Sequence, residues 1–448
     1  MNKHSKHLSI YSISIGLSFF LFVIVAFFIH FTFQADDYRF LAFSTSQEGL
    51  PLNIFGSYWA RVPIWCIFTW LLFFRPAFTQ TWISMFFVLL VHISCFVLLC
   101  KYLVQKTQTE IKHKKNKKLT FLCVFILFIF TFYPNYYEIL YWHTCFAYIL
   151  GLFFLVLGLY TRKKVVAVLA LTLSFLSSEM FIVPSICILL FPKVLTWTPF
   201  SFKRSVKDVL KSLYPSWIFA AFFTIIIRLG LSLLFSPYAY GTSFRFKKVF
   251  HQIIQALLYL FTMNFYKTYW AASIVFIIAL ISLFAFLYKK KILNFTQIIL
   301  TVFLLIFSTA TFWIVRYSAV RALYGAGLFF NAFLVVFLFR AIKEGRWLKP
   351  ITVLSLVIGL VFLTHTAIIF LTKNHNFYVL KELEKDLIFQ MEKCPEPCCI
   401  KLHNFNEKIK RDWVLPEPSY WIYYATWIKN REFKKKNITF QAFSQSTK

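Results

Sequence analysis

Acidic residues are scarce in this chain. Its 448 residues include 17 Asp and Glu against 48 Lys and Arg, and glycine (11) and proline (14) are also few. The sequence has no Gly-rich loop that could cradle a phosphate, no Gly-x-Ser-x-Gly nucleophile turn and no internal repeat. The usual signatures of phosphate-loop enzymes and of serine hydrolases are therefore missing, which directs attention to the few acids.

Long hydrophobic runs dominate the chain instead. Hydrophobic residues make up 59% and aromatic residues 21% of the sequence, and several runs exceed the roughly 18 apolar residues that mark a membrane-spanning helix. Lipid cannot satisfy backbone polar groups, so these runs must be helical, and their all-round apolar pattern excludes a barrel of alternating strands. We expect an all-α, polytopic membrane protein.

The net charge of +31 lies in clusters between the hydrophobic runs. Basic clusters at such positions follow the positive-inside rule of membrane topology. We therefore expect contact with membrane lipids and no nucleic-acid partner. The first run, Leu8 to Phe33, follows Lys3 and Lys6 and is too long for a signal-peptide core, so we expect an uncleaved helix that begins in the cytoplasm.

The run from Trp59 to Phe74 decides the topology. If it crossed the membrane, the later basic loops would all lie outside, against the positive-inside rule. Its brevity, Pro63 and the flanking Arg61 and Arg75 favour a short helix on the outer face. We then expect about 11 spans, with the amino terminus inside and the carboxyl tail outside. These spans are Leu8 to Phe33, Trp82 to Val104, Thr120 to Phe132, Cys145 to Tyr160, Val165 to Ser178, Phe181 to Leu195, Ser216 to Phe235, Trp270 to Tyr288, Phe295 to Val315, Ala322 to Arg340 and Ile351 to Leu371.

Residues 373–448 differ in composition from the rest and hold nine of the 17 acids. We interpret residues 1–372 as the membrane domain and residues 373–448 as a small extracytoplasmic tail. Three tail cysteines, Cys394, Cys398 and Cys399, could form one disulfide and leave one thiol. A metal site is less favoured there because no partner pair of His or Cys accompanies them.

Five acids before the tail map to the outer side or to helix ends near it: Asp36, Asp37, Glu48, Glu138 and Glu179. A charge at membrane depth is costly unless it is paired, hydrated or used, so such residues are candidates for function. Glu138 lies in an aromatic-rich segment, where an interfacial belt with an incidental acid explains it equally well. Glu179 follows one hydrophobic run and precedes the next almost without a loop, which favours a site.

Basic residues on the outer side are fewer than those inside. Arg245 precedes Lys247 and Lys248 in one outer segment, and Arg316 and Arg321 flank a short reversal between runs. Arginine forks and lysine charges bind phosphate oxygens well. Ordinary anionic lipids explain the two lysines equally well. Arg228, inside an apolar run, remains unassigned: it could pair with a carboxylate, line a cavity or extend to the membrane surface.

Short motifs carry a family resemblance. A first helix followed by Ala35-Asp36-Asp37-Tyr38, then Tyr58-Trp59-Ala60-Arg61, Glu138 with Tyr141-Trp142, and Ser178-Glu179 resembles the GT-C class of membrane glycosyltransferases. Within that class the chain is similar to bacterial proteins with an Asp-Asp-Tyr motif, and more loosely to glucosyltransferases that decorate surface polysaccharide. Ala60 stands where many relatives have glycine.

The resemblance implies an inverting transfer of a sugar from a polyprenyl-phosphate carrier to a glycan or lipid acceptor outside a bacterial inner membrane. Asp36 or Asp37 would be the general base, since an acceptor hydroxyl needs a proton acceptor. Candidate substrate-binding residues are Arg61, Glu138, Trp142, Glu179, Arg245, Arg316 and Arg321, with Arg316 or Arg321 on the donor phosphate. In this class an outer acid can also help to bind a divalent metal such as Mg or Mn, although no His-rich ligand set accompanies these acids.

Two other functions remain open. A transporter or flippase for a lipid-linked or small anionic substrate also uses membrane acids and arginines, but paired halves and helices broken at mid-membrane, typical of transporters, are not evident. A non-catalytic scaffold leaves the one-sided placement of the acids unexplained.

Overall fold

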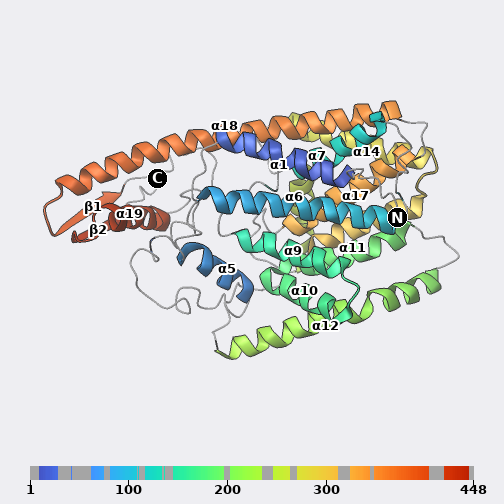
Figure 1. Ribbon diagram of the computed structural model, residues 1–448, viewed down its shortest axis with the longest axis horizontal. Coiled ribbons are helices and arrows are strands. Elements are labelled where there is room, and N and C mark those ends of the chain that lie inside the picture. The colour runs from blue at the N-terminus through green and yellow to red at the C-terminus, as the bar shows by residue number, and fades with distance from the viewer. Residues whose placement is uncertain are drawn as a thin grey trace, which may run out of the picture.

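The computed structural model describes residues 10–28, 42, 62–74, 81–107, 109, 117–133, 136, 145–195, 202–234, 246–262, 270–310, 323–343, 348–402 and 418–442. Within these ranges the chain is almost entirely helical. Figure 1 shows long helices lying along a common direction, with the carboxyl-terminal elements gathered at one end of the bundle. The predicted helical class is confirmed.

Each predicted span contains a helix. These helices are α1 (Ile10–Phe28), α6 (Thr81–Lys106), α7 (Lys117–Thr131), α9 (Phe146–Tyr160), α10 (Lys164–Ser177), α11 (Ile182–Leu195), α12 (Phe202–Leu234), α14 (Trp270–Lys289), α15 (Phe295–Ser308), α17 (Tyr324–Lys343) and α18 (Leu348–Lys393).

Helix α17 is the centre of the bundle. All of its residues except Arg340 and Lys343, at its last turns, are buried. Its phenylalanines pack as a ladder: the Phe329 and Phe333 ring centroids lie 5.6 Å apart, and those of Phe333 and Phe337 lie 5.4 Å apart. A helix that is apolar on every side is expected at the middle of a packed layer.

The outer surface of the bundle is apolar as well. On α12, Leu233 is 88% exposed and Leu229 is 61% exposed, and large apolar side chains of α14 and α18 are also uncovered. Among the described residues, four helices are long and apolar enough to cross a membrane, namely Phe86–Lys106, Pro215–Leu234, Tyr324–Lys343 and Lys349–Lys393. Apolar surface of this extent would be unfavourable in water and is the expected covering for a lipid-embedded protein. The fold is that of a helical membrane protein.

The short run that decides the topology forms helix α5 (Pro63–Phe74). Its 12 residues measure about 18 Å, well short of the roughly 30 Å of a hydrocarbon core. Pro63 is its first residue, where the missing N–H has no intrahelical partner to lose. Figure 1 shows α5 beside α9 and α10 at the end of the bundle nearer the tail.

Three helices differ from the prediction. Helix α12 begins at Phe202, so part of the predicted basic loop is helical and Pro215 lies inside the helix. Helix α13 (Phe246–Thr262) occupies a stretch without a predicted span. Helix α18 runs for 46 residues and continues past the predicted boundary at residue 372, because the Lys, Glu and Leu residues beyond it are good helix formers.

The tail is a small mixed unit at the carboxyl-terminal end of α18. Strand β1 (Cys398–Leu402) pairs in parallel with β2 (Ile438–Ala442), and α19 (Pro418–Glu432) connects them. Of the three tail cysteines, Cys394 and Cys398 form a disulfide and Cys399 is an exposed thiol, which is the arrangement that the sequence left open.

The tail packs against the bundle through one apolar cluster. Trp421 and Tyr424 of α19 belong to the same buried cluster as Trp65 of α5 and Ala147 of α9. The side-chain amide of Asn430 also donates a hydrogen bond of 3.4 Å to the Ala42 carbonyl. The tail therefore contacts α5, α9 and Ala42 and is not attached to the bundle through α18 alone.

Candidate functional site

Of the predicted site residues, Glu179 lies within the described part of the chain. The others lie outside the described residues: Asp36, Asp37, Arg61, Glu138, Trp142, Arg245, Arg316 and Arg321. The geometry of Glu179, and of the described residues that flank the remaining segments, therefore defines the candidate site.

Glu179 sits on a tight turn between two helices. Helix α10 ends at Ser177, and Ser178 adopts an extended backbone (φ −164°, ψ 137°) that redirects the chain. The Ser178 hydroxyl accepts a hydrogen bond of 3.3 Å from the Met180 backbone N–H, which caps the 3-10 helix η4 (Glu179–Phe181). Helix α11 begins at Ile182. The predicted near-loopless turn is therefore present.

The Glu179 carboxylate faces an arginine on a neighbouring helix. Its Oε1 lies 3.3 Å from Nη1 of Arg228, on α12, and the other terminal nitrogen of Arg228 donates a hydrogen bond of 2.9 Å to the Phe175 carbonyl. The side chains of Arg228 and Glu179 are 21% and 26% exposed. Of the three roles left open for Arg228, the structure gives pairing with a carboxylate. The pair partly compensates two charges that would otherwise be costly at this depth.

The start of α17 packs closely on η4. A Cβ at Gly325 would lie 2.3 Å from the Met180 carbonyl oxygen, so only glycine allows this approach. The Phe181 ring meets the Tyr324 ring edge to face, with centroids 6.1 Å apart. The turn that carries Glu179 is thereby held against the residues that follow Arg321 in the chain.

A buried aromatic group joins this contact to the end of α7. The Tyr324 and Tyr136 rings are 5.5 Å apart, and Tyr136 and Tyr133 are 5.3 Å apart. The Tyr133 hydroxyl donates a hydrogen bond to the Leu260 carbonyl at the end of α13. Tyr136 is the last described residue before Glu138. The segments next to Glu138, Glu179 and Arg321 therefore meet in one packed group.

Two polar side chains complete this group. A ring nitrogen of His92 on α6, Nδ1, lies 2.6 Å from the Tyr324 hydroxyl. The Asn331 side-chain amide donates bonds of 2.8 Å to the Tyr136 hydroxyl and 2.9 Å to the Gly327 carbonyl. Neither His92 nor Asn331 is among the site residues predicted from the sequence, although each is a polar residue within a strongly apolar run.

An apolar hollow lies beside α17. It has a volume of about 290 Å³ between α13, α14, α15 and α17, and its lining includes Leu257, Phe284, Thr301 and Phe330. Its walls offer contacts to a hydrocarbon chain.

Within the described ranges, no three His, Cys, Asp or Glu side chains come together as metal ligands do. No family model, curated protein or solved structure matches the chain.

Proposed function

We propose that this chain is an integral-membrane glycosyltransferase that moves a sugar from a polyprenyl-phosphate carrier to an acceptor on the extracytoplasmic side. The observation that carries the proposal is the packed group formed by Tyr136, Tyr324 and Phe181. These residues adjoin the segments of Glu138, Arg321 and Glu179, which sequence reasoning had selected independently.

Chain geometry supports a shared site. Consecutive Cα atoms are at most about 3.8 Å apart, so a residue two positions from Tyr136 and one three positions from Tyr324 stay within about 8 Å and 12 Å of them. Glu138 and Arg321 stand at these distances along the chain. The chain thus tethers an acid for the acceptor to Tyr136 and a cation for the donor phosphate to Tyr324, two residues of the same packed group.

The proposed chemistry divides between the acids and the arginines. Asp36 or Asp37 accepts the proton of the acceptor hydroxyl, which attacks the anomeric carbon as the bond to the carrier phosphate breaks. Arg316 or Arg321 stabilises the negative charge that develops on the leaving phosphate. Arg228 pairs with Glu179 and orients its carboxylate towards the acceptor side. The apolar hollow beside α17 offers a place for part of the carrier's hydrocarbon chain.

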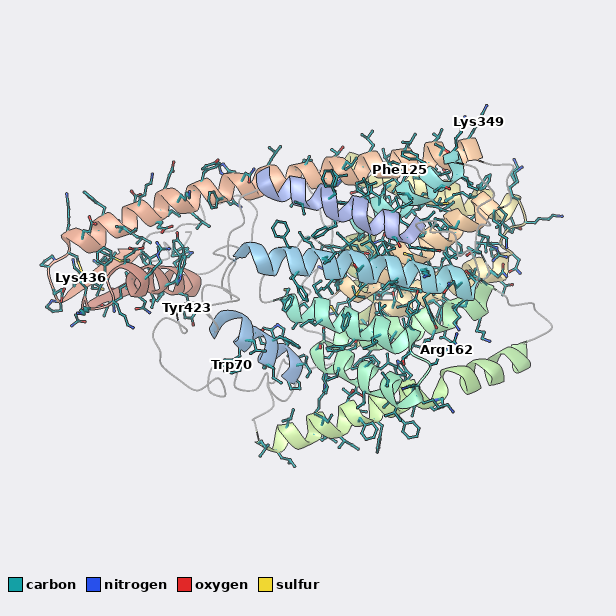
Figure 2. All side chains as sticks on the ribbon, viewed as in Figure 1. Trp70, Phe125, Arg162, Lys349, Tyr423 and Lys436 are labelled. Carbon is teal, nitrogen blue, oxygen red and sulfur yellow. A yellow bond between two sulfur atoms is a disulfide. The ribbon has the colours of Figure 1, made fainter. Side chains whose placement is uncertain are left out.

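We further propose about 11 spans, an inner-membrane location and an outer tail. Figure 2 shows Arg162 and Lys349 at the end of the bundle away from the tail residues Tyr423 and Lys436. Basic residues of short loops favour the cytoplasmic side, which supports this orientation. Cys399 provides the test, since the other unpaired cysteines are buried. A membrane-impermeant maleimide should label intact cells at Cys399 and leave Cys399→Ser unlabelled. Labelling only after the membrane is opened would reverse the orientation.

The activity itself is tested with reconstituted protein and radiolabelled polyprenyl-phosphate sugars. We expect label to move to a glycan or lipid acceptor, and Asp36→Asn or Asp37→Asn to abolish the transfer at normal expression. If both variants transfer sugar as the parent does, the assignment of the base is wrong.

A transporter or flippase is the second candidate. The ion pair between Glu179 and Arg228 and the polar atoms of His92 and Asn331 within apolar helices favour it, because such groups also line substrate paths. The same vesicles distinguish the two functions. Movement of the intact lipid-linked sugar across the bilayer without transfer would identify a transporter.

A further inference from the structure

A groove lies between α14 and α18 on the surface of the bundle. It has a volume of about 540 Å³. Its floor consists of Ala279, Leu283 and Ile351, which are at most 6% exposed, whereas the side chains along its rims include Ile278 and Val353, which are 57% and 60% exposed. A groove with a buried floor and exposed rims is a surface that a neighbouring molecule can cover.

The lining of the groove is apolar and extends along one face of α14. The lining residues from Val275 to Phe286 recur at intervals of three and four positions, which places them on a single helix face. They span about 17 Å along the helix axis, close to the roughly 15 Å that one leaflet contributes to a hydrocarbon core. Among the described residues that line the groove, only Ser282 has a polar side chain. The groove therefore matches a hydrocarbon chain of one leaflet in both length and polarity.

Basic side chains follow the groove on both helices. The helical spacing continues past Phe286 to Lys289 and Lys290, and both lysines are exposed. The Lys290 backbone N–H donates a hydrogen bond of 3.0 Å to the Phe286 carbonyl, so the helical path includes both residues. On α18, the exposed Lys349 immediately precedes Pro350, which lines the groove.

Contacts within the bundle place these lysines at one end of it. The start of α17 packs on η4, just before α11, and further along both helices the Phe337 ring lies 5.6 Å from the Phe191 ring. Helices α11 and α17 therefore run in the same direction. Gln297, near the start of α15, donates a hydrogen bond of 2.8 Å to the Leu195 carbonyl at the end of α11. The turn between α14 and α15 thus lies at the end where α17 stops and α18 begins, away from the tail (Figure 2).

The charge of these lysines indicates what covers the groove. No Asp or Glu occurs from residue 270 to 308 or from residue 349 to 381, so neither helix supplies a carboxylate to this end of the groove. A second copy of the chain in the same membrane would bring its own lysines to the same depth, and like charges placed together are unfavourable. An anionic lipid has the complementary charge, and basic pockets between transmembrane helices bind such headgroups.

We propose that the groove between α14 and α18 binds an anionic phospholipid. An acyl chain lies along the apolar floor, and the headgroup phosphate meets Lys289 and Lys349. This inference goes beyond the proposed function and does not depend on it, because the site lies at the end of the bundle away from the tail and its ligand is a lipid of the surrounding membrane. Lysine charges attract the phosphate, and the groove retains the chain.

Binding of defined lipids to the full chain in detergent micelles tests the headgroup. Native mass spectrometry compares phosphatidylglycerol with phosphatidylcholine of the same acyl chains, and we expect the parent protein to retain phosphatidylglycerol preferentially. Lys289→Gln combined with Lys349→Gln should weaken this binding about 30-fold, which corresponds to about 1 kcal/mol for each lysine near an anionic headgroup. The matched control is Lys163→Gln combined with Lys164→Gln, which removes the same charge from two exposed lysines at the start of α10 and should leave binding unchanged.

A second pair of variants tests the groove. Ser282→Phe fills the groove from an exposed position and should cause loss of the bound phosphatidylglycerol, whereas Ala285→Phe adds the same ring at an exposed position of α14 outside the groove and should not. Equal retention of the two lipids by the parent overturns the inference, as do equal losses from the two lysine pairs or unchanged binding in Ser282→Phe. A dimer that retains no phosphatidylglycerol and that Ser282→Phe dissociates would show that a second copy covers the groove, and would also overturn it.

Discussion

Gly325→Ala tests the close contact between α17 and the turn that carries Glu179. The new Cβ would lie 2.3 Å from the Met180 carbonyl oxygen and 3.1 Å from a Pro184 side-chain carbon, whereas real Cβ contacts essentially never fall below 3.0 Å. Because the first obstacle is backbone, α17 and η4 must separate by about 0.7 Å. Overpacking of this kind costs about 1–3 kcal/mol, and we expect the upper half of that range.

The assay is reversible unfolding in mixed detergent micelles, followed together with sugar transfer. Gly230→Ala is the matched control, since a Cβ at Gly230 on α12 meets nothing within 4 Å. It should be neutral or stabilise the helix by up to about 1 kcal/mol. If Gly325→Ala unfolds at the same point as the parent protein and the control, the close approach is not a constraint, and the argument that joins Glu179 to α17 fails.

Three further predictions concern charge and the tail. Glu179→Gln and Arg228→Gln should each destabilise the chain by about 1–3 kcal/mol, because each breaks the ion pair between two largely buried side chains. The double variant should lose clearly less stability than the sum of the two single losses. If the two losses add in a double-mutant cycle, the ion pair contributes nothing to stability. Burial raises the pKa of Tyr424, so the folded tail favours the neutral phenol. The stability of the tail should therefore be constant with respect to this group below about pH 10, where the unfolded phenol is neutral, and should fall as the pH rises further. Hydrogen exchange of α19 measures this loss of stability, and the Tyr424→Phe variant should show a weaker dependence on pH. An equally steep fall with pH in that variant would exclude Tyr424 as its source. Replacing Cys394 and Cys398 by serine opens a loop with a sequence separation of 4 and should cost the tail about 2 kcal/mol. Hydrogen exchange of α19 also measures this loss of stability. Equal protection of α19 with and without the disulfide would contradict the prediction.

The helices of the bundle could be predicted well from the sequence because lipid imposes a simple rule on them. Runs without charges must be helical and must have a minimum length, so the predicted run from Trp82 to Val104 and the observed helix Thr81–Lys106 differ by only one or two residues at each end. The rule does not apply outside the hydrocarbon region. Composition changes after residue 372, yet α18 continues to Lys393, since a change in polarity does not by itself end a helix.

The candidate site was harder to predict because its contacts join residues far apart in the chain. Glu179 could be selected as an acid on a short turn, but its partner Arg228 lies 49 residues away. His92 and Tyr324 are 232 residues apart. The sequence does contain a usable signal for such residues, namely single polar side chains in otherwise apolar runs, but one sequence does not indicate which of them meet.

Because helix α18 is unbroken, it fixes how the tail is rotated about the helix axis relative to the bundle. Its 46 residues span about 69 Å, more than twice the roughly 30 Å hydrocarbon core. A single residue inserted in its carboxyl-terminal half would turn the tail by about 100° around the helix axis and carry Asn430 away from Ala42. Seven inserted residues would nearly restore the angle and move the tail about 10 Å along the axis. The carboxyl-terminal half of this helix therefore tolerates substitutions far more readily than changes in length.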